Sequence, residues 1–68
     1  MSLVTDIKEA VTNRHPSLRA GQAAFNRLYE LSPRWADSIR SGPLDPFHRD
    51  ERLDEFYAFI IREIEVKP

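Results

Sequence analysis

Prolines divide this chain of 68 residues into short segments. Each proline removes a backbone donor and pushes the residue before it out of helical geometry. The internal prolines lie at positions 16, 33, 43 and 46. Between them, apolar residues such as Leu3, Ile7 and Val11 recur at intervals of three or four rather than alternately. This spacing is typical of helices, and it predicts an all-α fold without strands.

We predict four short helices, over residues 3–14, 17–31, 33–41 and 50–65. The clearest start is Ser32-Pro33, since serine can cap a helix and proline fits its first position. Gly42-Pro43 ends that helix, because glycine tolerates positive φ and proline cannot continue the helix. Asp50 complements the amino end of the last helix.

The size of the chain allows one compact domain over residues 1–68 and no second one. Apolar residues make up 41% of the chain and charged residues 31%, which is typical of a folded globular protein. There is no cysteine, so helix packing or oligomerisation has to stabilise the fold. The predicted core consists of Ile7, Val11, Leu18, Phe25, Leu28, Trp35, Ile39, Phe47, Leu53, Phe56, Ile60 and Ile64.

Polar residues accompany the predicted core of the second helix and the loop at 42–49. Gln22 and Asn26 lie four residues apart and therefore on one helix face. We expect their amides to bond the loop backbone and to form a structural polar unit with Asp45 and Asp50, since buried polar groups are nearly always paired. The alternative is that they line a binding site. In the loop, Asp45 and Pro46 are expected to set a turn that inserts Phe47 into the core.

The last helix carries apolar residues on more than one face. Apolar residues at positions 53, 56, 57, 60, 61 and 64 form a continuous stripe that is wider than a surface helix needs, and Phe59 adds a second apolar patch beside it. The additional apolar side chains predict a surface that binds a protein partner or a second copy of the chain, and these are Tyr57, Phe59 and Ile61. We therefore predict a non-enzymatic protein–protein interaction module, and a homodimer unless it has an obligate partner.

The net charge of −1 argues against strong attraction to nucleic acid or an anionic membrane. Residues 1–44 carry six basic and four acidic groups, whereas residues 45–68 carry four basic and seven acidic groups. These opposite net charges favour attraction between the two halves or between two copies. The sequence contains no long apolar run and no pattern of a signal peptide, so we expect a cytoplasmic protein that does not enter a membrane.

Few residues suit catalysis or metal binding. His15 and His48 are the only histidines, and neither a cysteine nucleophile nor a glycine-rich phosphate loop is present. Asp45, His48, Asp50 and Asp54 lie close in sequence, but their spacing does not fit a calcium loop. We predict no catalytic residue, no metal site and no cofactor; a nuclease using His48 and Arg49 is the least improbable enzyme.

The second and third helices also have the proportions of a helix-turn-helix. The third helix and the residues after it would then present Arg34, Ser38 and Ser41 to a major groove. Asp37 on the same helix opposes phosphate contact. A small DNA-binding regulator is therefore the alternative to the interaction module.

Two short motifs carry a resemblance to known proteins. They are the Gly-Gln-x-x-Phe-Asn run at 21–26 and the Asp-Pro-Phe-x-x-Asp loop at 45–50. Over residues 18–60 the chain resembles a class of short bacterial and phage-borne proteins without an established activity. The resemblance implies that Gln22, Asn26, Asp45 and Asp50 form one unit, and it implies no catalytic or binding role.

Overall fold

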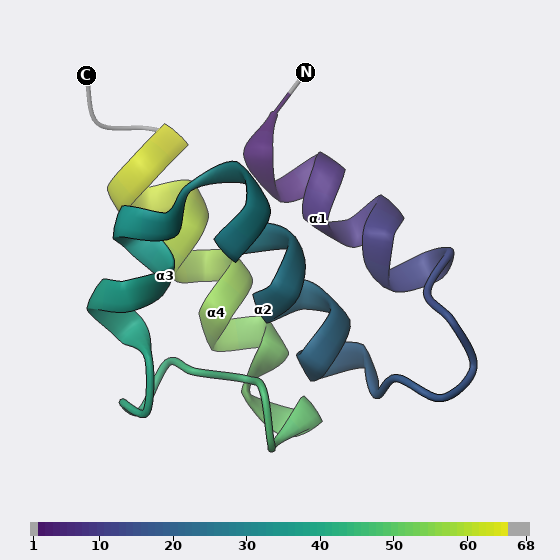
Figure 1. Ribbon diagram of the computed structural model, residues 1–68. Helices are drawn as coiled ribbons and strands as arrows, with labels where there is room; N and C mark the ends of the chain where they lie inside the picture. The colour runs from purple at the N-terminus through teal and green to yellow at the C-terminus, as the bar shows by residue number, and fades with distance from the viewer. Residues whose placement is uncertain (1, 66–68) are drawn as a thin grey trace.

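The structure is a computed structural model that describes residues 2–65. All regular secondary structure in this range is helical, and no strand occurs in it (Figure 1). The predicted all-α class is therefore confirmed. The four α-helices are α1 (Leu3–Thr12), α2 (Ala20–Leu31), α3 (Pro33–Ile39) and α4 (Leu53–Ile60). Helix α2 is central, because it contacts α1, α3 and the 3₁₀ turn η1 (Asp50–Arg52) that precedes α4.

Helix α1 begins where a serine caps it and ends earlier than expected. The Ser2 hydroxyl accepts a hydrogen bond from the Thr5 amide at 3.1 Å. At the other end, Asn13 leaves helical geometry. The Arg14 guanidinium then donates to the Val11 carbonyl at 2.7 Å, which satisfies one of the last carbonyls of α1. The helix therefore stops at Thr12 and not at residue 14.

Helix α2 begins three residues after the predicted Ser17, because Ser17 belongs to a turn. The Ser17 hydroxyl lies 2.7 Å from His15 Nδ1, and the Leu18 amide donates to the His15 carbonyl at 2.9 Å. Arg19 is extended and offers no side-chain cap to α2. The cap comes from a distant residue instead, since the Gly21 amide donates to the Asp50 carboxylate at 2.9 Å. Asp50, expected to complement its own helix, thus caps α2.

The last helical segment is less regular than the predicted single helix over residues 50–65. It begins as η1, continues as α4 and ends in a π-helical turn, η2 (Ile61–Glu65). The Glu65 carboxylate at its end accepts a hydrogen bond from the Val4 amide at 2.8 Å. An acidic group at the amino end of α1 also suits the helix dipole.

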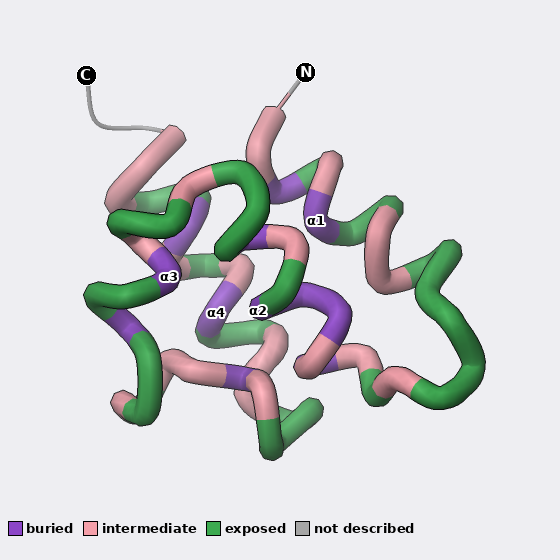
Figure 2. The backbone as a smooth tube through the Cα atoms, in the orientation of Figure 1, coloured by how far each residue is buried: buried purple, intermediate pink, exposed green. Residues whose placement is uncertain are grey.

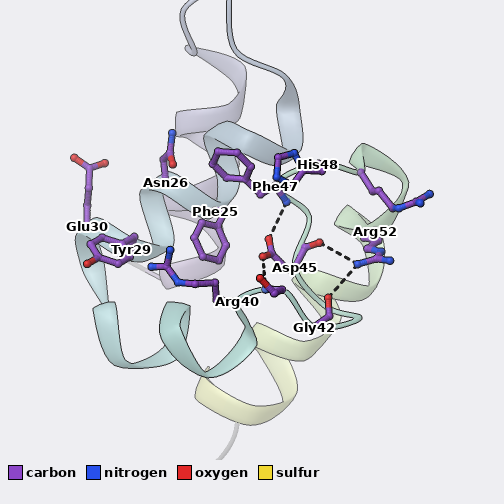
Figure 3. Close-up of a pocket in the computed structure, with 12 residues that line it drawn as sticks. Phe25, Asn26, Tyr29, Glu30, Arg40, Gly42, Asp45, Phe47, His48 and Arg52 are labelled. Atoms are coloured by element: carbon purple, nitrogen blue, oxygen red, sulfur yellow. Dashed lines mark hydrogen bonds between the residues drawn. The ribbon is translucent and has the colours of Figure 1, made fainter.

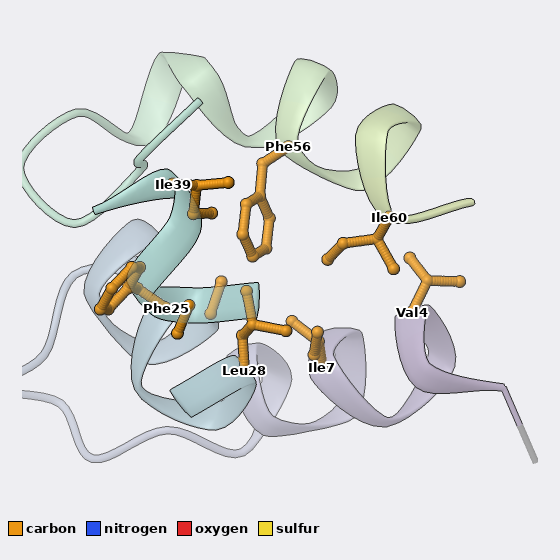
Figure 4. Close-up of a cluster of buried hydrophobic side chains, with 9 residues drawn as sticks. Val4, Ile7, Phe25, Leu28, Ile39, Phe56 and Ile60 are labelled. Carbon is orange, nitrogen blue, oxygen red and sulfur yellow. The ribbon is translucent and has the colours of Figure 1, made fainter. Parts of the chain in front are cut away.

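Side chains from all four helices meet in one core (Figure 4). Phe56 points from α4 between Ile39 and Leu28, while Val4 faces Ile60 at the other end (Figure 4). The buried residues lie where helices face one another (Figure 2), and they are Val4, Ile7, Ala24, Phe25, Leu28, Ala36, Ile39, Phe56 and Ile60.

Six of the expected core residues are buried there and five more pack partly buried against the cluster. Leu18 is the exception, since it lies in the turn before α2 and outside the cluster. Val4, Ala24 and Ala36 were not among the expected core residues, but they are buried in the cluster.

An ion pair fastens α1 to α2 at the edge of this core. Arg27 Nε lies 2.7 Å from Asp6 Oδ1, and both side chains are about one-third exposed. The hydrogen bond from Arg27 holds the pKa of Asp6 below its ordinary value. The pair therefore stabilises the ionised carboxylate.

We predict that Gly21→Ala destabilises the fold by about 1 to 3 kcal/mol, the usual cost of overpacking. A Cβ at this position would overlap the carbonyl of Pro46. The cost of this overlap outweighs the gain in helix propensity of roughly 1 kcal/mol that replacing glycine by alanine brings inside a helix. Urea unfolding would measure the change.

The matched control is Gly42→Ala, because a Cβ there meets only the Ile39 carbonyl, at 3.3 Å. It should cost clearly less than Gly21→Ala. Equal effects of the two substitutions would contradict the proposed close approach of Pro46 to α2.

Candidate functional site

The loop between α3 and η1 (residues 40–49, the 40–49 loop) is organised by one carboxylate. Asp45 accepts hydrogen bonds from the Ser41 amide at 2.7 Å and from the Phe47 amide at 2.9 Å. The first bond holds Ser41 in the left-handed region, with φ 63°. Gly42, which was expected to take positive φ, does not. Because Asp45 bonds the backbone on both sides, the loop has a defined shape.

Further contacts attach the 40–49 loop to the helices. The Arg52 guanidinium donates to the carbonyls of Gly42 at 3.0 Å and Asp45 at 3.4 Å. From the other side, Arg19 donates to the Phe47 carbonyl at 3.2 Å. Pro46 is fully buried against α2. Phe47, which was expected inside the core, is half-buried and packs against the core cluster.

Between α2 and the 40–49 loop lies a hollow of about 850 Å³, which we name the α2–loop hollow (Figure 3). Its volume lies within the range of about 300 to 1,000 Å³ that is usual for ligand sites. Its lining is aromatic and polar, and consists of Phe25, Asn26, Tyr29, Glu30, Arg40, Ser41, Gly42, Asp45, Phe47, His48, Arg49 and Arg52.

Aromatic rings and one arginine form the centre of this lining. Phe25 is only 5% exposed, and Phe47 meets it edge to face with ring centroids 5.9 Å apart. The Arg40 guanidinium lies 5.5 Å from the Phe25 ring and 5.4 Å from the Tyr29 ring, over both of them (Figure 3). Asp37 holds this guanidinium at 3.0 Å. Cation–π contacts therefore position Arg40 in the α2–loop hollow.

The structure separates the four residues of the predicted polar unit. Asp45 and Asp50 both bond backbone amides, as a structural role requires. Asn26 is exposed, Gln22 is half-buried, and within residues 2–65 neither side chain forms a hydrogen bond. The expected amide bonds to the loop are therefore wrong. Gly21 lies close to Pro46. The backbone amide of Gly21, and not a side-chain amide of α2, therefore makes the link to the 45–50 segment.

The predicted partner surface on the last helix is partly covered within the chain. Tyr57 is half-buried beneath Lys8, whose Nζ lies 5.1 Å from the ring, and burial raises the pKa of Tyr57. Phe59 packs against Trp35 with ring centroids 5.6 Å apart. Ile61 is 42% exposed. Of these three residues, Ile61 offers the most accessible apolar side chain.

The other candidate sites are less well formed. No group of three potential metal ligands occurs among the described residues. The presumed reading helix α3 has only seven residues. On it, Asp37 pairs with Arg40 and the Ser38 hydroxyl bonds the Trp35 carbonyl at 2.8 Å. A DNA-binding regulator stays the alternative to the interaction module, and the absence of enzymatic activity stays a prediction.

Sequence reasoning missed the part that Arg40 and Tyr29 play in the α2–loop hollow. One signal for it exists, because Phe25 and Tyr29 lie four residues apart and share a helix face. The position of Arg40 opposite this face depends on the turn at α3 and could not be read from spacing.

Comparisons with protein-family models, curated proteins and solved structures gave no match. Within the described residues, no helix has both the length and the apolar character needed to cross a membrane.

We predict that Asp45→Ala destabilises the protein by about 1 to 3 kcal/mol, because the amides of Ser41 and Phe47 lose their acceptor. Asp54→Ala is the control, since Asp54 is exposed and makes no hydrogen bond within residues 2–65. It should change the free energy of unfolding by no more than about 0.5 kcal/mol. Thermal melts compare the two variants, and an equally mild effect at Asp45 would refute its role in shaping the loop.

Proposed function

We propose that the chain is a non-enzymatic protein–protein interaction module that receives a segment of its partner in the α2–loop hollow. The observation that supports this most is Tyr29, an aromatic side chain that is 44% exposed in a hollow whose lining also contains Phe25, Phe47 and several polar and charged side chains. Aromatic residues with a polar rim are typical of binding hot spots. We also propose that the chain acts in the cytoplasm, because it has no cysteine and so forms none of the disulfides that are common in oxidising compartments.

The contacts that hold the 40–49 loop support the same proposal. Asp45, Arg52 and Arg19 fix the loop backbone through hydrogen bonds within the chain itself. A preformed site loses little conformational freedom when it binds, so more of the contact energy contributes to affinity. The hollow is also open to solvent on the side of Tyr29, so an extended segment of a larger protein can enter it.

The test compares two truncations on α2. Tyr29→Ala removes an exposed side chain from the α2–loop hollow, whereas Leu31→Ala removes one that is similarly exposed, at 41%, and does not line it. Proteins captured from the source cell would be quantified by mass spectrometry for wild type and both variants. We expect that at least one captured partner is recovered at least about tenfold less with Tyr29→Ala than with the wild type, as for a hot spot. Its recovery with Leu31→Ala should equal that with the wild type.

Both variants should retain their melting temperature to within a few degrees, because neither side chain belongs to the core cluster. If Tyr29→Ala recovers every captured protein at the same level as the wild type, the proposed binding site is contradicted.

Self-association is a second candidate, and the exposure of Ile61 favours it. Ile61 lies two residues from Phe59, which lines a small apolar depression together with Ile39, Pro43 and Leu44. The opposite net charges of the two halves of the chain would assist pairing of two copies. A homodimer would bury these apolar side chains.

We expect Ile61→Asp to shift the protein towards the monomer in sedimentation equilibrium at high micromolar concentration. Leu31→Asp is the control, since Leu31 is an equally exposed apolar residue on a different helix. A wild-type protein that is already monomeric under these conditions would remove the homodimer from consideration.

A further inference from the structure

Hydrogen-bond donors outnumber acceptors in the α2–loop hollow. The guanidinium of Arg49 and the amide of Asn26 make no side-chain hydrogen bond within residues 2–65. Arg52 uses only one of its terminal nitrogens on loop carbonyls. A ligand that fits this lining therefore has to supply acceptors, and a carboxylate pairs best with a guanidinium.

The charged side chains in the lining also favour a ligand that carries a carboxylate. Three arginines, Arg40, Arg49 and Arg52, face two carboxylates, Glu30 and Asp45. Both oxygens of Asp45 already accept backbone amides. Glu30 lies 3.7 Å from Arg27 and Arg40 lies 3.0 Å from Asp37, so each of these two charges is reduced by a neighbour outside the lining. The lining carries one formal positive charge more than negative ones on a chain whose net charge is −1, and its Arg49 makes neither an ion pair nor a side-chain hydrogen bond among residues 2–65.

We propose that the α2–loop hollow recognises an acidic segment of a protein partner, with a carboxylate against Arg49 and an apolar side chain against Tyr29 and Phe47. This inference rests on the proposed function and adds the chemistry of the ligand. Arg49 is exposed and makes no ion pair within the described residues, so it can pair with the ligand without breaking a contact of the fold.

Single-stranded nucleic acid also combines anionic groups with flat rings, but the lining suits it less well. Base stacking needs an aromatic ring with a free face. Arg40 already lies over both Phe25 and Tyr29, and Phe25 is nearly buried. Phe47 already packs against the rings of Phe25 and His48, with ring centroids 5.9 and 4.8 Å away. An acidic peptide can instead bind to the guanidinium edges and to the side of Tyr29.

The experiment selects random dodecapeptides displayed on phage against the wild-type protein and rejects those that still bind Tyr29→Ala. We expect the peptides that depend on the α2–loop hollow to contain more Asp and Glu than Lys and Arg. The most enriched peptide is then synthesised and titrated. Arg49→Glu should weaken its binding at least about tenfold, as expected for loss of a close charge pair.

Arg34→Glu is the matched control, because Arg34 is an exposed arginine on α3 outside the lining. It makes the same change in net charge and should weaken binding by less than about threefold at physiological salt, where distant charges are screened. Melting curves of both variants should match the wild type. Equal effects of the two reversals would overturn the role of Arg49.

Other results separate this inference from the proposed function. Selected peptides that depend on Tyr29 but are basic or uncharged would overturn the acidic ligand and leave the interaction site in place. The same holds if no peptide is selected while capture of a cellular partner still depends on Tyr29. If neither selection nor capture depends on Tyr29, both proposals fail. Tighter binding of an oligo-dT probe than of any peptide, lost in Tyr29→Ala, would overturn the acidic peptide in favour of nucleic acid.

Discussion

The junction at the start of α2 holds the two halves of this protein together. Gly21 lies against the carbonyl of Pro46, and its amide bonds the carboxylate of Asp50. The contact is possible only because residue 21 has no Cβ. It places the 40–49 loop beside α2, and thereby creates the α2–loop hollow. It acts together with the core, in which side chains from all four helices meet.

The helices could be predicted from the sequence because their signals are local. Pro33 marks the start of α3, although the side chain of Ser32 does not make the expected capping hydrogen bond, and Ser2 caps the start of α1. The prediction was wrong where a side chain had a competing partner. Ser17 bonds His15 and does not cap α2. Asp50 does lie in the first turn of the last helical segment, but its carboxylate also accepts a hydrogen bond from the amide of Gly21, 29 positions away. The spacing of residues along the chain does not reveal such pairings between distant residues.

The candidate site was harder to predict than the fold for the same reason. Asp45 was correctly assigned to the turn, since an aspartate before proline bonds the backbone nearby. Asn26 was assigned to the loop on its helix face alone, but the close approach at Gly21 brings Pro46 to a different part of α2. Arg40 joins Phe25 and Tyr29 only through the path of the chain after α3. A binding site made from three segments depends on their packing, which no single segment encodes.

The π-helical turn at Ile61–Glu65 has a consequence for related sequences. Such a turn is equivalent to one residue inserted into a regular helix. Deleting one residue there would restore regular α-helical geometry and rotate the side chains beyond it by about 100°. Glu65 would then turn away from the amide of Val4, and α1 would lose that attachment. A homologue one residue shorter in this turn would keep nearly the same composition and helical pattern, and yet the amino end of its first helix would be held by the packing of Val4 in the core without this hydrogen bond.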